Sequence, residues 1–179
     1  MSQVSTTTSS PRRRVAMTWV VWITAVIAYG FAVMQRTSLG VMGLTAAAHF
    51  NAPASVVATF MVLQLAVYAV LQIPAGITVD RLGSRVVITA GSIVMTVGQV
   101  VMALTGSVGG AVLARVLVGC GDAFIFGAAI RLVPAWFPPK QTPLVTQLTG
   151  LLGQFGQVVS AVGLVAMVNS SGWRSTYLL

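Results

Sequence analysis

The sequence predicts an all-α integral membrane protein, and three observations support this fold class. Of the 179 residues, 56% are hydrophobic and only 7% are charged, whereas about a quarter are charged in an average globular domain. The mean hydropathy is +0.92. The apolar residues also form five long runs, each with the roughly 20 residues that a helix needs to cross a ~30 Å hydrocarbon core. We therefore predict five membrane-spanning helices.

Short polar connectors separate these runs, which fall at about 15–44, 54–79, 86–106, 111–133 and 143–168. A further apolar stretch, STYLL, follows Arg174, and we predict that it begins a sixth helix. Residues 15–179 are therefore expected to form one transmembrane helical bundle. Residues 1–14, MSQVSTTTSSPRRR, are polar and rich in Ser and Thr, which predicts a disordered cytoplasmic tail.

The basic residues predict the orientation of the bundle, because short cytoplasmic loops carry an excess of Lys and Arg. With the amino terminus inside, the inner side holds Arg12, Arg13, Arg14, Arg81, Arg85, Arg131 and Lys140. The outer connectors hold only Arg174. We therefore predict a multi-pass protein of the cell membrane, surrounded by lipid bilayer, with a cytoplasmic amino terminus. The net charge of +8 is spread singly between apolar runs, so nucleic acid is not an expected partner.

The stretch QIPAGITVDRLGSRVVI, residues 72–88, connects the second and third spans. Asp80 lies at the carboxyl end of its helix, where the helix dipole disfavours an anion. We expect compensation either from Arg81 and Arg85 or from the amino end of another helix, and such a contact can hold one conformation and release another. The alternative is an exposed ion pair of little energy that serves only topology, and charge alone favours it. Gly83 is free to adopt the positive φ that a tight turn requires.

Spacings of four, three and four place four residues of the fourth span on one helix face: Arg115, Gly119, Asp122 and Phe126. Arg115 and Asp122 are then ~10.5 Å apart along the axis. Asp122 is the only acid within a predicted span, and ionisable residues in a membrane usually face a cavity or a partner. Two interpretations are open. Arg115 and Asp122 form a structural pair, or Asp122 is a proton or cation coupling site whose titration Arg115 modulates.

Arg36 is a charged residue in the otherwise nearly uncharged stretch YGFAVMQRTSLGVMG of the first span. If Trp19 marks the inner interface, Arg36 lies ~25 Å along the helix, in the outer third of a long span. Tyr29 falls two turns earlier on the same face. The Arg36 side chain either extends to water at the outer interface or faces a central cavity, and the spacing leaves both open. In the cavity, its expected partner is a substrate anion or Asp122.

Polar residues recur along one face of two further spans. They are Gln64, Tyr68 and Gln72 in the second span, and Gln147, Gly150, Gln154 and Gln157 in the fifth. Such faces either line a water-filled path or hydrogen-bond neighbouring helices. We take Gln64, Tyr68 and Gln154 as candidate contacts for a solute.

Four short motifs follow one another along the predicted spans: Gly76-x-x-x-Asp80-Arg81-x-Gly83-x-Arg85, Ala114-Arg115-x-x-x-Gly119-x-Gly121, Trp136-Phe137-Pro138 and Gly172-Trp173-Arg174. Their residues and order resemble the major facilitator superfamily, secondary transporters built from two six-helix halves. The resemblance covers residues 15–179. It implies the amino-terminal half of such a transporter, with five complete spans and the start of a sixth, and a carboxyl-terminal half as its partner.

The first of these motifs resembles the family's loop between the second and third helices. The resemblance implies a gating role at the inner face for Gly76, Asp80, Arg81, Gly83 and Arg85. Ser84 stands where the family usually has a second basic residue.

The first span is similar to that of the anion:cation symporter and organophosphate branches of the superfamily, in Tyr29 and in the run Arg36-Thr-Ser-Leu-Gly. In those branches an arginine in this helix binds the anionic group of the substrate in the central cavity. The resemblance therefore implies Arg36 and Tyr29 as substrate contacts. A guanidinium suits carboxylate or phosphate, because it can donate two parallel hydrogen bonds. Gln35 stands where these branches usually have an acid.

The predicted function is secondary active transport of a small solute, an organic anion such as a carboxylate or sugar acid, by alternating access and driven by an ion gradient. Arg36 would bind the anion and Asp122 would couple it to protons or another cation. A drug or metabolite exporter of the same superfamily and a non-transporting membrane interaction protein are the alternatives. Segment 143–168 lacks the Gly-Pro motif of many exporters, which favours uptake. The sequence has no catalytic set, metal-ligand spacing or phosphate-binding loop, so we expect no enzyme activity, cofactor or metal.

Overall fold

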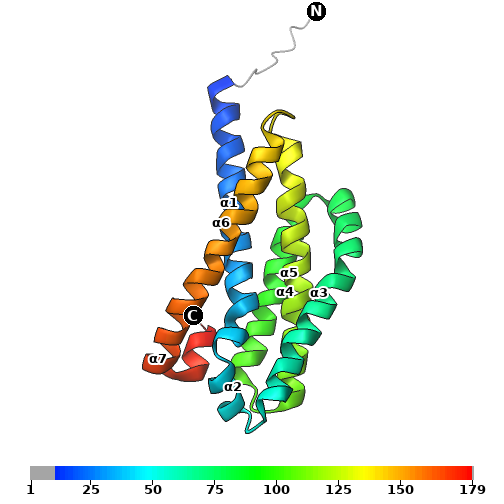
Figure 1. The fold of residues 1–179 in the computed structure, drawn as a ribbon. Coiled ribbons are helices and arrows are strands. Elements are labelled where there is room, and N and C mark those ends of the chain that lie inside the picture. Colours follow the sequence, from blue (N-terminus) through cyan, green and yellow to red (C-terminus); the bar gives the residue numbers. More distant parts are fainter. Residues whose placement is uncertain (1–10, 179) are drawn as a thin grey trace, which may run out of the picture.

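The computed structural model describes residues 11–178, and Figure 1 shows them as a bundle of long helices. In chain order the elements are α1 (Pro11–Val41), α2 (Gly43–His49), α3 (Ala54–Leu82), α4 (Ser84–Leu104), α5 (Val108–Trp136), α6 (Thr142–Val159), the π-helical turn η1 (Ser160–Leu164) and α7 (Val165–Leu178). Residues 11–178 contain no strand. The predicted all-α fold is therefore confirmed.

Five helical segments of the described chain are long and apolar enough to cross a membrane: Val15–Val41, Ala54–Leu82, Ser84–Leu104, Val108–Trp136 and Thr142–Leu178. Each contains one of the five predicted runs or overlaps most of it. Large apolar side chains also cover the outer surface of the bundle, among them Val70, Ile73, Leu144, Phe155 and Val162. A surface of this kind suits the hydrocarbon core of a bilayer, and the chain is a multi-pass membrane protein.

Both ends of the first predicted run differ from the expectation. Helix α1 begins at Pro11, so residues 11–14 are helical and do not belong to a disordered tail. Proline is favoured in the first helical turn, because its missing N–H would have no helical partner there. Residues 1–10, the rest of that predicted tail, lie outside the described part of the chain. At the other end α1 stops at Val41, and the short helix α2 begins at Gly43.

The fifth span runs from α6 through the π-helical turn η1 into α7 and extends beyond the predicted end at 168. The helical backbone is interrupted at Gly172, where φ is 77° and ψ is 175°. Helical structure resumes through Leu178. This geometry agrees with the expected start of a further helix near Arg174, because glycine permits the positive φ at which the chain changes direction.

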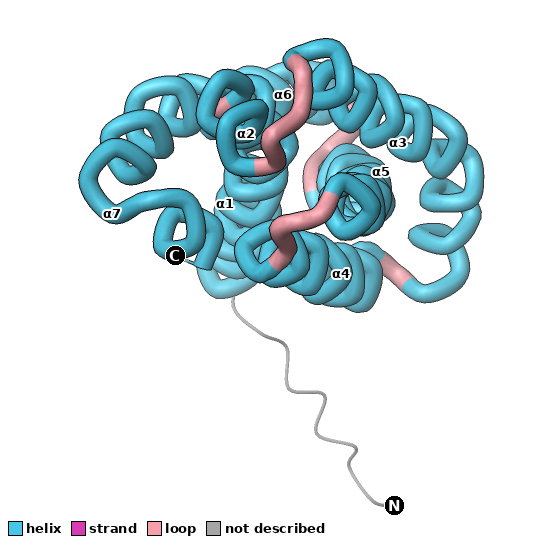
Figure 2. Tube along the Cα trace, turned by 90° about the horizontal axis from the view of Figure 1, so that it is seen from below, coloured by secondary structure: helices cyan, strands magenta, loops and turns pink. Residues whose placement is uncertain are grey.

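Small residues allow α5 to run through the middle of the bundle, between α3 and α4 and against α1 (Figure 2). A Cβ atom at Gly121 would lie 2.5 Å from the carbonyl oxygen of Gly91 in α4. A Cβ atom at Gly119 would lie 2.6 Å from the carbonyl oxygen of Gln64 in α3. Glycine thus lets both neighbouring helices approach α5 at backbone contact. The charged side chains of Arg115 and Asp122, near this crossing, are consequently fully buried.

The connection between α3 and α4 is a single residue, Gly83, with φ of 80° and ψ of 153°. This positive φ confirms the prediction for the turn, since residues with a Cβ atom rarely adopt it. The tight turn fixes the end of α3, which carries Asp80, beside the start of α4.

Candidate functional site

Arg36 of α1 and Asp122 of α5 form an ion pair inside the bundle. The distance between Arg36 Nη1 and Asp122 Oδ2 is 3.2 Å, and the side chains are 18% and 0% exposed. The second carboxylate oxygen, Oδ1, is buried without a hydrogen-bond partner among the described residues. The guanidinium therefore remains partly open, while the carboxylate that neutralises it is enclosed and only half satisfied.

Two tyrosines lie near this pair, Tyr29 of α1 and Tyr68 of α3. The Cζ atom of Arg36 lies 5.7 Å from the centroid of the Tyr68 ring, within cation–π range. The rings of Tyr29 and Tyr68 lie 5.3 Å and 6.3 Å from that of Phe126. Tyr29 is buried, with 3% of its surface exposed, whereas Tyr68 is half-buried. Tyr68 is thus the more accessible of the two predicted tyrosine contacts.

A pocket of about 270 Å³, which we call the Arg36 pocket, opens beside the guanidinium. It is lined by Arg36, Thr37, Gly40, Val41, Met61, Gln64, Leu65 and Gln157. These residues belong to α1, α3 and α6. Gln157 thus takes the place in this wall that we predicted for Gln154, which is exposed and does not line the pocket.

Arg115 does not pair with Asp122, and the structural pair considered from the sequence is therefore wrong. Arg115 is fully buried. Its Nη1 donates to Gln64 Oε1 at 3.4 Å, and its Nη2 donates to the Tyr177 hydroxyl at 3.3 Å. Arg115 and Asp122 lie two turns apart along α5, so each side chain contacts a different neighbouring helix. Asp122 meets Arg36, and Arg115 meets polar groups of α3 and α7.

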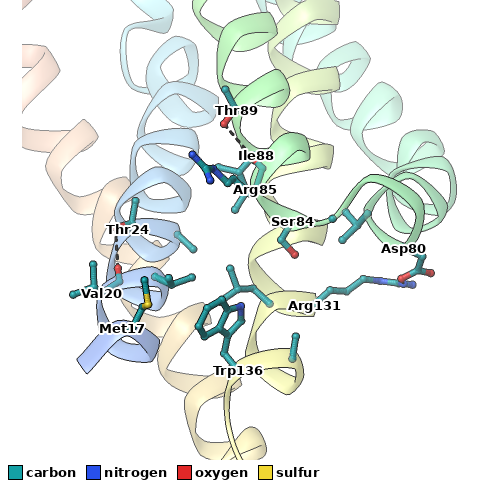
Figure 3. A pocket seen from close by; sticks show the side chains of 16 residues that line it. Met17, Val20, Thr24, Asp80, Ser84, Arg85, Ile88, Thr89, Arg131 and Trp136 are labelled. Carbon is teal, nitrogen blue, oxygen red and sulfur yellow. Dashed lines mark hydrogen bonds and ion pairs between the residues drawn. The ribbon is translucent and has the colours of Figure 1, made fainter. Parts of the chain in front are cut away.

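Asp80, in the first motif, pairs with Arg131 of α5 rather than with Arg81 or Arg85. Figure 3 shows Arg131 extending toward Asp80, while Arg85 points away from it on the opposite side of a pocket of about 890 Å³. Gly76 makes room for this contact, because a Cβ atom there would lie 3.1 Å from Arg131 Nη2. The predicted compensation of Asp80 therefore comes from a side chain of another helix. Both partners are exposed, at 47% for Arg131 and 61% for Asp80.

Two partners of these charged residues, Arg131 and Tyr177, were not predicted from the sequence. The sequence indicates Arg131 only as a basic residue at the inner end of the fourth span. Its one sequence signal is its position at the same predicted membrane face as Asp80. Tyr177 lies in the last few residues of the chain and had no signal, because its contact with Arg115 joins residues 62 positions apart.

Three curated proteins illustrate what this chain is similar to. A probable L-galactonate transporter of Escherichia coli K12 is 24% identical over 159 residues, which cover 89% of this chain and 34% of that protein. A probable sulfoacetate transporter of Cupriavidus necator is 26% identical over 112 residues, covering 63% of this chain and 26% of that protein. A hexuronate transporter of E. coli K12 is 25% identical over 114 residues, covering 64% and 26%.

The chain thus spans about a third of the length of the first relative and about a quarter of the other two. All three are named as transporters and none as an enzyme, in agreement with the prediction that this chain is not an enzyme. The model of the Major Facilitator Superfamily matches residues 21–179. This match covers most of the chain and confirms the resemblance drawn from the four motifs. The chain belongs to the Major Facilitator Superfamily.

Proposed function

We propose that this chain is part of a secondary active transporter that moves a small organic anion across the membrane by alternating access, coupled to protons. The observation that carries the proposal is the Arg36–Asp122 ion pair, enclosed among helices and open on the Arg36 side to a pocket. Charged groups within a membrane domain are expensive to maintain and usually serve a substrate or ion path.

The pair suggests how a proton and an anion would favour each other's binding. An ionised Asp122 neutralises Arg36, so the guanidinium then has little need of another anion. A protonated Asp122 leaves the charge of Arg36 without compensation in a low-dielectric site, which is unfavourable. A solute carboxylate in the Arg36 pocket would supply that compensation. The buried Oδ1 of Asp122, which has no hydrogen-bond partner among the described residues, is a free position for the proton.

An anionic solute suits both the residues and the relatives. A guanidinium can bind a carboxylate or sulfonate through two parallel hydrogen bonds. Thr37 and Gln157 add a hydroxyl and an amide to the same pocket, and Tyr68 adds an aromatic face beside Arg36. The relatives are named for L-galactonate, sulfoacetate and hexuronate, all of which carry an acidic group. We therefore place the solute among small organic acids.

Alternating access would need a second set of helices across the Arg36 pocket, and we propose a carboxyl-terminal half of the same transporter for this role. The Asp80–Arg131 pair would then act at the inner end of the bundle, because an exposed ion pair between two helices can break and reform as they move. The distribution of Lys and Arg supports a cytoplasmic amino terminus in the cell membrane.

Uptake into cells that express the full coding sequence tests this proposal. We expect accumulation of radiolabelled galacturonate but not of galactose, which has the same ring and no charge. A protonophore should abolish the accumulation. Equal uptake of both sugars would contradict anion selectivity, and accumulation that persists with the protonophore would contradict proton coupling.

A further inference from the structure

Gln64 of α3 connects the buried Arg115 to Arg36, whose side chain is partly exposed. Its Oε1 accepts a hydrogen bond from Arg115 Nη1 at 3.4 Å, and its Nε2 donates to the backbone carbonyl of Arg36 at 3.3 Å. Arg115 in turn donates to the hydroxyl of Tyr177 at 3.3 Å. A chain of hydrogen bonds thus runs from α7 through α5 and α3 to the main chain of α1, at the residue that carries the candidate anion-binding group.

This chain of contacts depends on the close approach of α3 and α5 at Gly119. A Cβ atom at position 119 would meet the Gln64 carbonyl oxygen at 2.6 Å and the Gln64 Cγ at 3.4 Å. Because the closest atom belongs to the backbone, a side chain at position 119 would push α3 at Gln64 away from α5 and so strain the Gln64–Arg115 hydrogen bond. Arg36 is consequently held at two points by the same helix: its guanidinium directly by Asp122, and its backbone by Arg115 through Gln64.

Gln64 itself is a poor ligand for a solute, although it lines the Arg36 pocket. Only 2% of its surface is exposed, and each of its two amide atoms already has a protein partner. A solute would have to displace one of these bonds, and a buried polar group that loses its partner is destabilising.

We propose that Gln64 is a positioning residue, not a solute ligand: it transmits the placement of Arg115 to the backbone of Arg36 and so holds the guanidinium at the Arg36 pocket. The inference rests on the proposed function, because it gives Arg36 the anion-binding role. During transport the Arg36 side chain would exchange Asp122 for the solute. Because Gln64 fixes the Arg36 backbone, the guanidinium would stay at the pocket during that exchange. Pre-organisation of this kind strengthens binding.

Two substitutions remove the connection, and each has a matched control. Gln64→Met keeps the side-chain volume and loses both hydrogen bonds. Its control, Gln99→Met, makes the same change at an equally buried glutamine. The Nε2 of Gln99 donates to the backbone carbonyl of Gln35 at 3.3 Å, and Gln99 forms no hydrogen bond with Arg115 among the described residues. Gly119→Ala leaves the Gln64 side chain unaltered and pushes its backbone away from α5. Gly127→Ala is its control on the same helix, since the nearest atom to a Cβ there lies 3.8 Å away.

Initial uptake of galacturonate and of sulfoacetate by the protein from its full coding sequence gives KM and maximal rate for each variant. We expect Gln64→Met and Gly119→Ala each to raise both KM values by about fivefold, the effect of the one hydrogen bond that the Arg36 backbone loses. The maximal rate per folded molecule and the ratio of the two KM values should not change, and the double variant should match the single ones. The two controls should keep the original KM.

Other outcomes would overturn the proposal. A changed ratio of the two KM values would make Gln64 a solute ligand, and a fall in folded protein at constant KM would make it merely structural. If the unmodified protein takes up neither anion, the proposed function fails, and hydrogen exchange of the peptide 33–42 then tests the positioning role. Faster exchange in Gln64→Met than in Gln99→Met would support it, and equal exchange would refute it.

Discussion

Arg36 and Asp122 lie 86 positions apart in the sequence and meet at 3.2 Å. Arg36 comes from the carboxyl-terminal part of α1, and Asp122 comes from the middle of α5. The chain has only two acids, Asp80 and Asp122, and each forms an ion pair with an arginine of another helix. One pair connects α1 to α5, and the other connects α3 to α5. The charges of this chain therefore act between helices, where a change in one pair can accompany a change in helix arrangement.

Replacement of Arg36 by Lys should weaken anion uptake while it preserves the charge. A lysine ammonium is a point charge and cannot donate the two parallel hydrogen bonds of a guanidinium. We expect the KM for galacturonate to rise by about tenfold or more, as for the loss of one charged hydrogen bond. Arg174→Lys, the same change at an exposed site, should have no effect. An unchanged KM in Arg36→Lys would exclude a bidentate contact with the solute.

Replacement of Asp122 by Asn should separate accumulation from exchange. Asparagine keeps the shape of the side chain but cannot carry the transported proton. In proteoliposomes, Asp122→Asn should abolish accumulation driven by a pH gradient and retain counterflow exchange of the anion. Asp80→Asn, the same change at the other acid, should leave accumulation responsive to the pH gradient. Loss of exchange with intact accumulation would be the reverse pattern and would reject Asp122 as the coupling residue.

The Asp80–Arg131 pair should affect the transport rate more than stability. Both side chains are exposed, and exposed pairs typically contribute less than about 1 kcal/mol. Asp80→Arg and Arg131→Asp should each lower the maximal uptake rate with little change in the thermal unfolding temperature. The double reversal restores opposite charges and should recover most of the rate. If the double variant is as slow as the single ones, the pairing itself is not what matters.

Glycine at position 156 should be essential to the contact between α1 and α6. A Cβ atom there would fall on the backbone of Gly30 in α1, and backbone cannot move aside as a flexible side chain can. We expect Gly156→Ala to destabilise the protein by about 1–3 kcal/mol, the usual effect of overpacking, measured by thermal unfolding in detergent. Gly150→Ala is the matched control on α6, since a Cβ there meets no atom within 4 Å. Equal unfolding temperatures for the two variants would disprove the close contact.

The sequence by itself determined the features that depend on local chemistry. Runs of apolar residues long enough to cross a bilayer predicted the five spans, because a helix in lipid must satisfy its own backbone and present apolar side chains. Gly83 marked the turn between α3 and α4, since its positive φ favours glycine. The position of Arg36 and Asp122 within apolar runs singled them out as charges that need a partner.

Only the tertiary structure decided which charges meet. Helical periodicity indicates which residues share a face, but not which neighbour that face contacts. The sequence left Arg115 and Arg36 both open as partners of Asp122. For Asp80 it offered Arg81 and Arg85 or the amino end of another helix. The actual partners are Arg36 and Arg131. Their contacts depend on how closely the helices approach at small residues such as Gly76 and Gly119. The packing of several helices together sets these distances, so the sequence of any one helix does not determine which side chains meet.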